Sequence, residues 1–278
     1  MSLFDSIGHS YSATRFAEPR IVKVLSDLLG PASGRTVADI GAGTGNYSVA
    51  LAEQGWSVIA IEPSAVMRGQ CRNHKAITWI DAKAESLALP DQSVDAAICV
   101  LALHHLQNMP AAFAEMARVV RNGPIVLFTF DPRAAQPFWL ADYFPGIFQS
   151  GYEIFPPIND VKSMLARATG RTVTDLAFPL PPDLSDVFLA ACWRSPHLYL
   201  DSQIRAGMSG FMLANENEVA DGLERLSKDL EDGSWQQKYG GVLNLETFDA
   251  GYRFIVATKA QVKARVVGYS ANTFISKR

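Results

Sequence analysis

The sequence predicts a doubly wound α/β fold, because short apolar runs alternate with longer amphipathic segments through its first half. These runs are rich in β-branched residues and are apolar on both faces, which is typical of strands buried in a parallel sheet. They span residues 36–40, 57–62, 77–80, 94–100 and 124–130. Helical segments lie between most of them, and repeated strand–helix–strand units with right-handed crossovers build such a sheet.

Glycine and proline mark the ends of the expected helices. One helical segment, residues 46–55, closes on Gly55, and another, residues 110–123, opens with Pro110 and closes with Gly123. A third helix is expected within residues 216–233, where an apolar stripe comprises Val219, Leu223, Leu226 and Leu230.

After Phe130 the alternation ends, and aromatic side chains become dense between Phe138 and Phe155. Regular strand–helix repetition does not require them, so we expect a largely helical cap made of residues 131–170 and 181–245. The α/β core then comprises residues 1–130, 171–180 and 246–258, with further strands at 171–180 and 252–258. Residues 259–278 form a basic C-terminal tail.

Composition restricts the class of partner. The chain has 278 residues, is 48% hydrophobic and carries a net charge of −3, so it lacks the basic surface typical of nucleic-acid binding. No run of about 18 or more apolar residues is present to span a membrane. The first residues lack a signal-peptide pattern, and the three cysteines lie far apart. We expect a cytoplasmic monomer or homodimer that binds a small molecule.

Three glycines alternate after the first expected strand, at Gly41, Gly43 and Gly45, with Asp39 two residues ahead. A loop at this place binds the ligand of an open α/β sheet. The dinucleotide pattern is GxGxxG, whereas this loop is GxGxG, with Asn46 at the last glycine position. Asp39 would repel a pyrophosphate and would suit an ammonium group. An ordinary tight turn is the alternative without a ligand.

Glu62 ends the second expected strand, where a carboxylate can accept both hydroxyls of a ribose. A nucleoside joined to an amino acid satisfies Asp39 and Glu62 together, which indicates S-adenosylmethionine. A plain exposed carboxylate at Glu62 remains the alternative, and a nicotinamide-dependent oxidoreductase is the competing function.

Four ordered segments resemble the class I S-adenosylmethionine-dependent methyltransferases, specifically the methyltransferase type 11 group. They read VADIGAGTGNYSVALAEQG, VIAIEPSAVM, AESLALPDQSVDAAICVLALHHL and EMARVVRNGPIVLFTF, and the resemblance covers about residues 35–130. It implies a Rossmann-like, mostly parallel sheet of seven strands. It also implies methyl transfer to an O, N or C nucleophile, with S-adenosylhomocysteine as the product.

The resemblance also implies a set of cofactor-binding residues. In relatives the glycine loop and its acidic residue hold the methionine part, the strand-end carboxylate holds the ribose, and a backbone turn reads the adenine. Lys83 stands where relatives often carry aspartate, so either Glu85 or Asp81 would contact the adenine amine. An N-terminal helix would add a tyrosine and an arginine. The residues implied are Tyr11, Arg15, Asp39, Gly41, Ala42, Gly43, Glu62, Pro63, Met67, Ala84, Glu85 and Leu101.

His104 and His105 follow the fourth expected strand. Methyl transfer is catalysed largely by positioning, which can contribute roughly 7 kcal/mol or more, and a base is needed only if the nucleophile loses a proton. His104, and less so His105, is the candidate catalytic base. In the alternative, the pair only forms the wall beside the cofactor. No metal is expected, because ligand spacing is absent.

Substrate contacts are expected from the cap, through Trp139, Tyr143, Arg205 and Met208. Aromatic side chains here, with Phe144, Phe148 and Tyr152, favour an aromatic or aliphatic acceptor. In the alternative, the rings only attach the cap to the sheet or form a dimer contact. A protein that binds the cofactor without catalysis also remains open, since fold alone does not establish activity.

Overall fold

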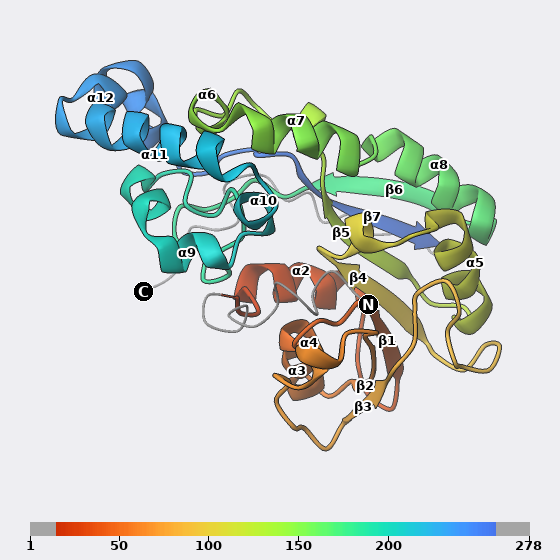
Figure 1. The fold of residues 1–278 in the computed structure, drawn as a ribbon. Coiled ribbons are helices and arrows are strands. Elements are labelled where there is room, and N and C mark those ends of the chain that lie inside the picture. The colour runs from red at the N-terminus through yellow and green to blue at the C-terminus, as the bar shows by residue number, and fades with distance from the viewer. Residues whose placement is uncertain (1–14, 260–278) are drawn as a thin grey trace.

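The computed structural model describes residues 15–259, and at its centre lies a seven-stranded sheet (Figure 1). Its strand order is β3-β2-β1-β4-β5-β7-β6. The strands are β1 (Thr36–Ile40), β2 (Ser57–Ile61), β3 (Ile77–Ile80), β4 (Ala96–Val100), β5 (Ile125–Phe130), β6 (Thr172–Ala177) and β7 (Tyr252–Thr258). The predicted Rossmann-like sheet of seven mostly parallel strands is confirmed, since β7 alone runs opposite to the other six strands.

The chain reverses direction across the sheet between β1 and β4. From β1 it proceeds outward to β2 and β3, then crosses to β4 on the other side of β1. Ile40 and Ile61 are paired at the ends of β1 and β2, so the loops that follow these strands emerge at the same edge. This topological switch point is where open α/β sheets bind ligands.

Helices cover both faces of the sheet. On one face, α2 (Pro19–Leu29) and α3 (Asn46–Glu53) share a buried cluster with β-strand residues such as Ile98 and Phe128. On the other face, α5 (Met109–Val119) and α8 (Ile158–Thr169) bury apolar side chains with Cys99 and Leu127. The short helix α4 (Ala65–Arg68) follows β2.

Helix α8 packs with the core elements rather than with the other cap helices. Residues 131–170 were assigned to the cap, but α8 contacts α5, β6 and β7, and its Val161 and Leu165 are buried in the core cluster of that face. We therefore place α8 in the core layer. The cause is its apolar stripe, which covers sheet surface that would otherwise be exposed.

The cap elements α9 to α12 gather on one side of the molecule, and α6 and α7 contact α11 and α10 respectively (Figure 1). Large aromatic side chains form much of its interior, including Trp139, Trp193, Tyr199 and Trp235. The cap helices are α6 (Leu140–Tyr143), α7 (Pro145–Ile154), α9 (Ser202–Ala206), α10 (Ser209–Met212), α11 (Glu216–Glu231) and α12 (Ser234–Tyr239). Single 3-10 turns occur at Leu103–His105, Pro132–Ala134, Pro196–Leu200 and Gly240–Asn244.

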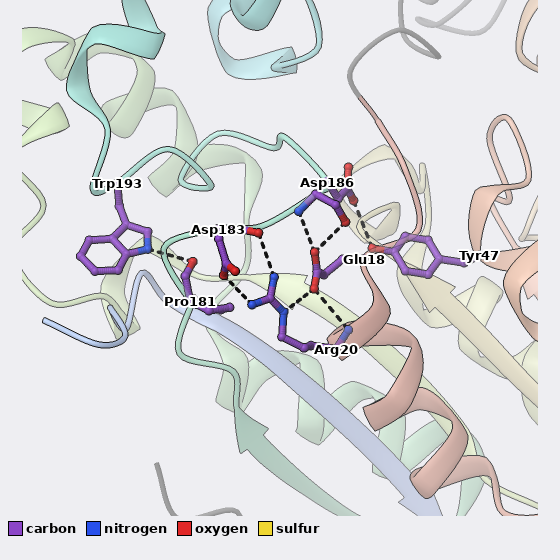
Figure 2. A network of polar contacts seen from close by, with 8 residues as sticks. Glu18, Arg20, Tyr47, Pro181, Asp183, Asp186 and Trp193 are labelled. Atoms are coloured by element: carbon purple, nitrogen blue, oxygen red, sulfur yellow. Dashed lines mark hydrogen bonds and ion pairs between the residues drawn. The ribbon is translucent and has the colours of Figure 1, made fainter. Parts of the chain in front are cut away.

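A polar network joins the start of α2 to the cap segment 181–193 (Figure 2). Glu18 caps α2 through the backbone N–H of Arg20, and it also accepts hydrogen bonds from the backbone N–H and hydroxyl of Ser185, both at 2.7 Å. Arg20 donates in turn to Asp183 at 2.6 Å. We call these four residues, Glu18, Arg20, Asp183 and Ser185, the latch. It fixes the chain before α2 against the cap.

Among residues 15–259, no helix combines the length and the apolar character needed to cross a bilayer.

Candidate active site

The glycine loop after β1 turns back on the end of β2. The backbone N–H groups of Gly41 and Ala42 both donate to Ile61 O, at 2.9 and 3.0 Å, and Gly43 has a φ of 59°, in the left-handed region. A Cβ on Gly41 would lie 2.7 Å from Ala102 Cβ, and one on Gly43 would lie 3.3 Å from Met67 Cε. Glycine is therefore required for this close approach.

Glu62 follows β2 directly and is 6% exposed. Its two carboxylate oxygens accept backbone N–H groups from Gly43 at 3.0 Å and from Ser64 at 2.8 Å. These bonds orient the carboxylate, and carboxylate oxygens are hydrogen-bond acceptors of the kind that suits ribose hydroxyls. Glu62 lines a cavity of about 750 Å³, here called the larger cavity to distinguish it from a smaller one of about 100 Å³ beside it.

Asp39 lies behind the glycine loop and is not among the residues that line the larger cavity. It accepts a hydrogen bond from the Ser48 hydroxyl at 2.6 Å, which ties β1 to α3. The pKa of Asp39 is raised to about 6: burial raises it most, the hydrogen bond from Ser48 lowers it, and the neighbouring charge of Glu62 adds a smaller rise. The structure therefore shows Asp39 hydrogen-bonded to Ser48 behind the loop, and its expected contact with a ligand stays a prediction.

The turn expected to read adenine lines the larger cavity with Asp81, Lys83, Ala84 and Glu85. Glu85 Oε1 accepts the backbone N–H groups of Gln107 and Asn108, at 2.7 and 3.0 Å, so it also holds the loop after β4. Asp81 pairs with Arg68 at 2.7 Å. Both candidate acidic residues therefore border the cavity.

Arg15 lines the larger cavity, whereas Tyr11 lies outside the described residues. The Nε atom of Arg15 lies 2.5 Å from Asp186 Oδ1, and its Nη2 atom lies 3.2 Å from Asp186 Oδ2, which makes a two-point ion pair. The Tyr47 hydroxyl also donates to Asp186 at 3.1 Å. The side-chain amide of Asn46 donates to Arg15 O at 2.9 Å, so the residue that replaces the fingerprint glycine holds this segment in place.

Asp186 is a site residue that sequence reasoning missed. It is 1% exposed, lines the larger cavity and comes from the cap, 171 residues after Arg15. The only local signal is an acidic residue beside the apolar pair Val187 and Phe188. A buried carboxylate requires a partner, but spacing could not identify Arg15 as that partner.

His104 and His105 lie in a 3-10 turn after β4 and line both cavities. Burial lowers the pKa of His104 well below its usual range, with further lowering from His105 and Arg15, and burial lowers the pKa of His105 to about 4. Both imidazoles are therefore neutral near pH 7. His104 Nδ1 is buried and has no hydrogen-bond partner within residues 15–259.

Leu101 precedes this turn with a φ of 53°, a conformation that leucine rarely adopts. Its N–H donates to Phe128 O at 2.8 Å, and its side chain lines both cavities. The strain costs on the order of 1–3 kcal/mol and occurs where the two cavities meet.

The smaller cavity, about 100 Å³, lies between the sheet edge and the cap. It shares four residues with the larger cavity and is lined mostly by apolar side chains. The shared residues are Arg15, Leu101, His104 and His105; the remaining ones are Phe130, Ile147, Phe148, Ser150, Gly151, Ile154, Phe155, Phe188, Leu189, Ser209, Gly210, Leu213, Ala214 and Tyr252.

The four predicted substrate-binding residues line neither cavity. Trp139 Nε1 donates to Trp193 O at 2.8 Å, and the Tyr143 hydroxyl donates to Asp229 at 2.6 Å. Arg205 donates to Tyr199 O at 2.6 Å, and Met208 is buried. The structure thus places these side chains in the packing of the cap, and their expected role in substrate binding stays a prediction. Of the aromatic residues considered with them, Phe148 reaches the smaller cavity.

The larger cavity suits S-adenosylmethionine by its own features. Its volume lies within the range of about 300–1,000 Å³ typical of small-molecule sites. Glu62 can accept ribose hydroxyls, and Met67 and Leu101 offer apolar surface. Carboxylates outnumber basic groups in its wall, as suits a cationic ligand: Glu62, Asp81, Glu85 and Asp186 against Arg15 and Lys83. In the described part of the chain, no cluster of three His, Cys, Asp or Glu side chains could hold a metal ion.

Comparison with known proteins identifies the class. A methyltransferase domain family, type 11, matches residues 38–128. A crystal structure from Anabaena variabilis ATCC 29413, named as a methyltransferase from an antibiotic biosynthesis pathway, is 49% identical, with a TM-score of 0.86. The alignment covers 88% of this chain and 99% of that one. The chain therefore belongs to the class I S-adenosylmethionine-dependent methyltransferases, in the type 11 group.

Two more distant proteins are similar to this chain, one in sequence and one in fold. The demethylmenaquinone methyltransferase of Tropheryma whipplei (strain Twist) is 28% identical over 153 residues, which is 49% of this chain but only 62% of that relative. The phosphoethanolamine N-methyltransferase 2 of Haemonchus contortus, solved in complex with S-adenosyl-L-methionine, has a TM-score of 0.57 at 14% identity. That alignment covers 92% of this chain and 57% of the other, and it shows a common fold.

Proposed function

We propose that this protein transfers a methyl group from S-adenosylmethionine to an O, N or C nucleophile of a small molecule. The observation that carries the proposal is the larger cavity at the switch point, where the glycine loop and Glu62 lie side by side. Asp39 contributes from behind the loop by fixing Ser48, and so the start of α3.

The residues of this chain would hold the cofactor along the larger cavity. Glu62 would accept the ribose hydroxyls, the backbone of Ala84 would border the adenine, and either Glu85 or Asp81 would accept its amine. Gly41, Ala42 and Gly43 would line the methionine part, close to Arg15 and Asp186. Pro63 and Met67 would contact the adenosine from the β2 side.

Bound S-adenosylmethionine supplies a methyl group that is already activated on a sulfonium. The protein's part is therefore mainly positioning, together with removal of a proton where the nucleophile carries one. His104 is suited to that task, because its imidazole is neutral near pH 7 and its Nδ1 has no hydrogen-bond partner in the described residues. His105 packs against it with ring centroids 3.7 Å apart and forms the wall.

Three further sequence predictions accompany the proposal: cytoplasmic location, a monomeric or homodimeric state, and no metal requirement. Binding of S-adenosylmethionine without turnover is not proposed, because no feature of the site favours it. A nicotinamide-dependent oxidoreductase is disfavoured by the glycine spacing and by membership of the methyltransferase family.

Calorimetric titration with S-adenosylmethionine, S-adenosylhomocysteine and NAD tests the cofactor assignment. We expect the first two to bind and NAD not to bind. Glu62→Ala should weaken both affinities by about tenfold or more, because it removes a charged hydrogen-bond acceptor. Glu53→Ala, an exposed carboxylate on α3, is the matched control and should bind as the wild type does. Unchanged affinity in Glu62→Ala, or binding of NAD alone, would contradict the proposal.

A further inference from the structure

The smaller cavity opens from the same residues that end the larger one. Leu101, His104 and His105 form part of both walls. A molecule in the smaller cavity would therefore lie next to a cofactor in the larger cavity, with these three residues beside both. Its volume of about 100 Å³ is comparable to, though below, the roughly 150 Å³ cavity known to hold benzene. It can therefore enclose one small ring or a short branched chain.

The mouth of the smaller cavity is apolar as well. Ile154 and Leu213 both line it, and they are 42% and 49% exposed, so they lie where the cavity meets solvent. Ile154 is the last residue of α7, and Leu213 directly follows α10. A ligand with a ring in the cavity can thus extend an apolar portion outward between these two side chains.

Charge is scarce in this wall. None of the described residues that line the smaller cavity is a carboxylate, and the one cation, Arg15, is held in a two-point ion pair by the buried Asp186. An anionic ligand would have to compete with Asp186 for Arg15, and a cationic ligand would find no counter-charge. Burying an unpaired charge is costly, so the cavity favours an uncharged occupant.

His104, which lines the cavity, carries an unsatisfied polar atom. His104 lies between His105 and Phe155, whose ring centroids are 3.7 and 4.5 Å from its own, and its Nδ1 is buried without a partner among residues 15–259. A buried polar atom left unpaired costs about 1–3 kcal/mol, so such atoms in native sites indicate a missing partner. A hydroxyl or amine on the occupant would supply it.

We propose that the smaller cavity binds the methyl acceptor, and that the acceptor is an uncharged molecule with a compact apolar ring whose hydroxyl or amine donates to His104 Nδ1. The inference rests on the proposed methyltransferase function and adds the site and chemical class of the acceptor. It replaces the cap residues expected from the sequence with the end of α7, the segment after α10, and β7.

The proton balance follows from this placement. As the acceptor oxygen or nitrogen bonds to the methyl carbon, its bond to hydrogen breaks and the proton passes to His104 Nδ1. The carbon–sulfur bonding pair stays on sulfur, which becomes neutral. The site thus holds one positive charge before and after the step, first on the sulfonium and then on the imidazolium. No further oxidant, reductant or metal is required.

Binding of phenol and benzoate to the full chain tests the inference. Both probes have one ring, but benzoate is an anion at pH 7. By calorimetry in the presence of S-adenosylhomocysteine, phenol should bind, and benzoate should bind about tenfold more weakly or not at all. Leu213→Trp should narrow the mouth and weaken phenol binding by about tenfold. Leu245→Trp is the matched control, because Leu245 is also exposed, at 39%, and lines neither cavity.

The outcomes separate this inference from the proposed function. Affinity for S-adenosylhomocysteine should be the same in both tryptophan variants, which verifies that they fold. Binding of S-adenosylhomocysteine with no phenol binding, equal affinity for benzoate, or an equal effect of Leu213→Trp and Leu245→Trp would overturn the acceptor site. Phenol binding that Leu213→Trp removes, in a protein that does not bind S-adenosylhomocysteine, would instead refute the cofactor assignment.

Discussion

At the residue scale, Gly41 lies where backbone conformation and close packing coincide. Its φ is 70°, and the Cβ that any other residue would carry lies 2.7 Å from Ala102 Cβ. Ala102 follows the strained Leu101 at the junction of the two cavities, so a shift here would move the cavity wall. Gly34 has the same φ of 70° but no atom within 4 Å of its missing Cβ. A comparison of substitutions at the two glycines therefore distinguishes the effect of backbone strain from that of a steric contact.

We expect both Gly41→Ala and Gly34→Ala to destabilise the fold by about 1–2 kcal/mol, because both place alanine in the left-handed region. Only Gly41→Ala should weaken S-adenosylmethionine binding, by about tenfold or more, since it displaces the loop that lines the larger cavity. Chemical denaturation and calorimetry measure the two effects. Equal cofactor affinity in the two variants would show that the loop tolerates the added methyl group.

At the element scale, α11 crosses α6 at a glycine. Gly222 lies in the middle of α11, and a Cβ there would come 2.5 Å from Tyr143 O and 2.6 Å from the Phe144 ring. Arg225, one turn later, donates to Tyr143 O at 2.7 Å. The backbone contact at Gly222 thus sets how closely α11 approaches the segment that leads into α7, and α7 lines the smaller cavity.

Gly222→Ala should destabilise the protein by about 1–3 kcal/mol, because the added methyl group overpacks this crossing. Helix propensity alone would give the opposite sign, since alanine in a helix interior is favoured over glycine by about 1 kcal/mol. Asp221→Ala, at the exposed neighbouring position, should change the free energy of unfolding by less than about 0.5 kcal/mol. A more stable Gly222→Ala protein would show that α11 and α6 can move apart without cost.

At the scale of the whole molecule, the latch and the Arg15–Asp186 pair connect cap and core beside the larger cavity. Both use residues just before or at the start of α2 and residues 183–186 of the cap, and Figure 2 shows the contacts of the latch. Burial opposes the charge of Glu18, but donors from Arg20 and Ser185 prevail and hold the pKa of Glu18 below its ordinary 4.5. The cap position therefore depends on this carboxylate remaining ionised.

Glu18→Gln should reduce the free energy of unfolding by about 1–3 kcal/mol at pH 7, because a buried acceptor of charged hydrogen bonds is lost. Since the folded pKa is lowered, the stabilisation by Glu18 is present above pH 4.5 and is lost as the pH falls through the folded value. The difference between variant and wild type should thus shrink in acid, as urea denaturation at several pH values can measure. Asp27→Asn, which breaks an exposed pair with Lys23 on the same helix, should cost less than about 0.5 kcal/mol at any pH.

The core could be predicted because its signals are local. The strand at 36–40 was expected with the bounds that β1 has, and those at 77–80 and 252–258 coincide with β3 and β7. Glu62 and the glycine loop border the larger cavity, as expected, because strand ends and the loops after them meet at one edge of a parallel sheet. The cap has no comparable local signal. Side chains typical of a pocket can also pack away from both cavities, as the following do: Trp139, Tyr143, Arg205 and Met208.

By itself, the sequence determined the doubly wound sheet, its switch point and the family, because periodicity within each strand and the spacing of the glycine loop are properties of neighbouring residues. The tertiary structure alone decided that Asp39 binds Ser48 behind the loop, that Asp186 joins Arg15 across 171 residues, and that α7, α10 and β7 contribute to a second cavity at His104. These contacts depend on how the cap packs against the sheet, and that packing is set by complementary shape and charge between segments far apart in the chain.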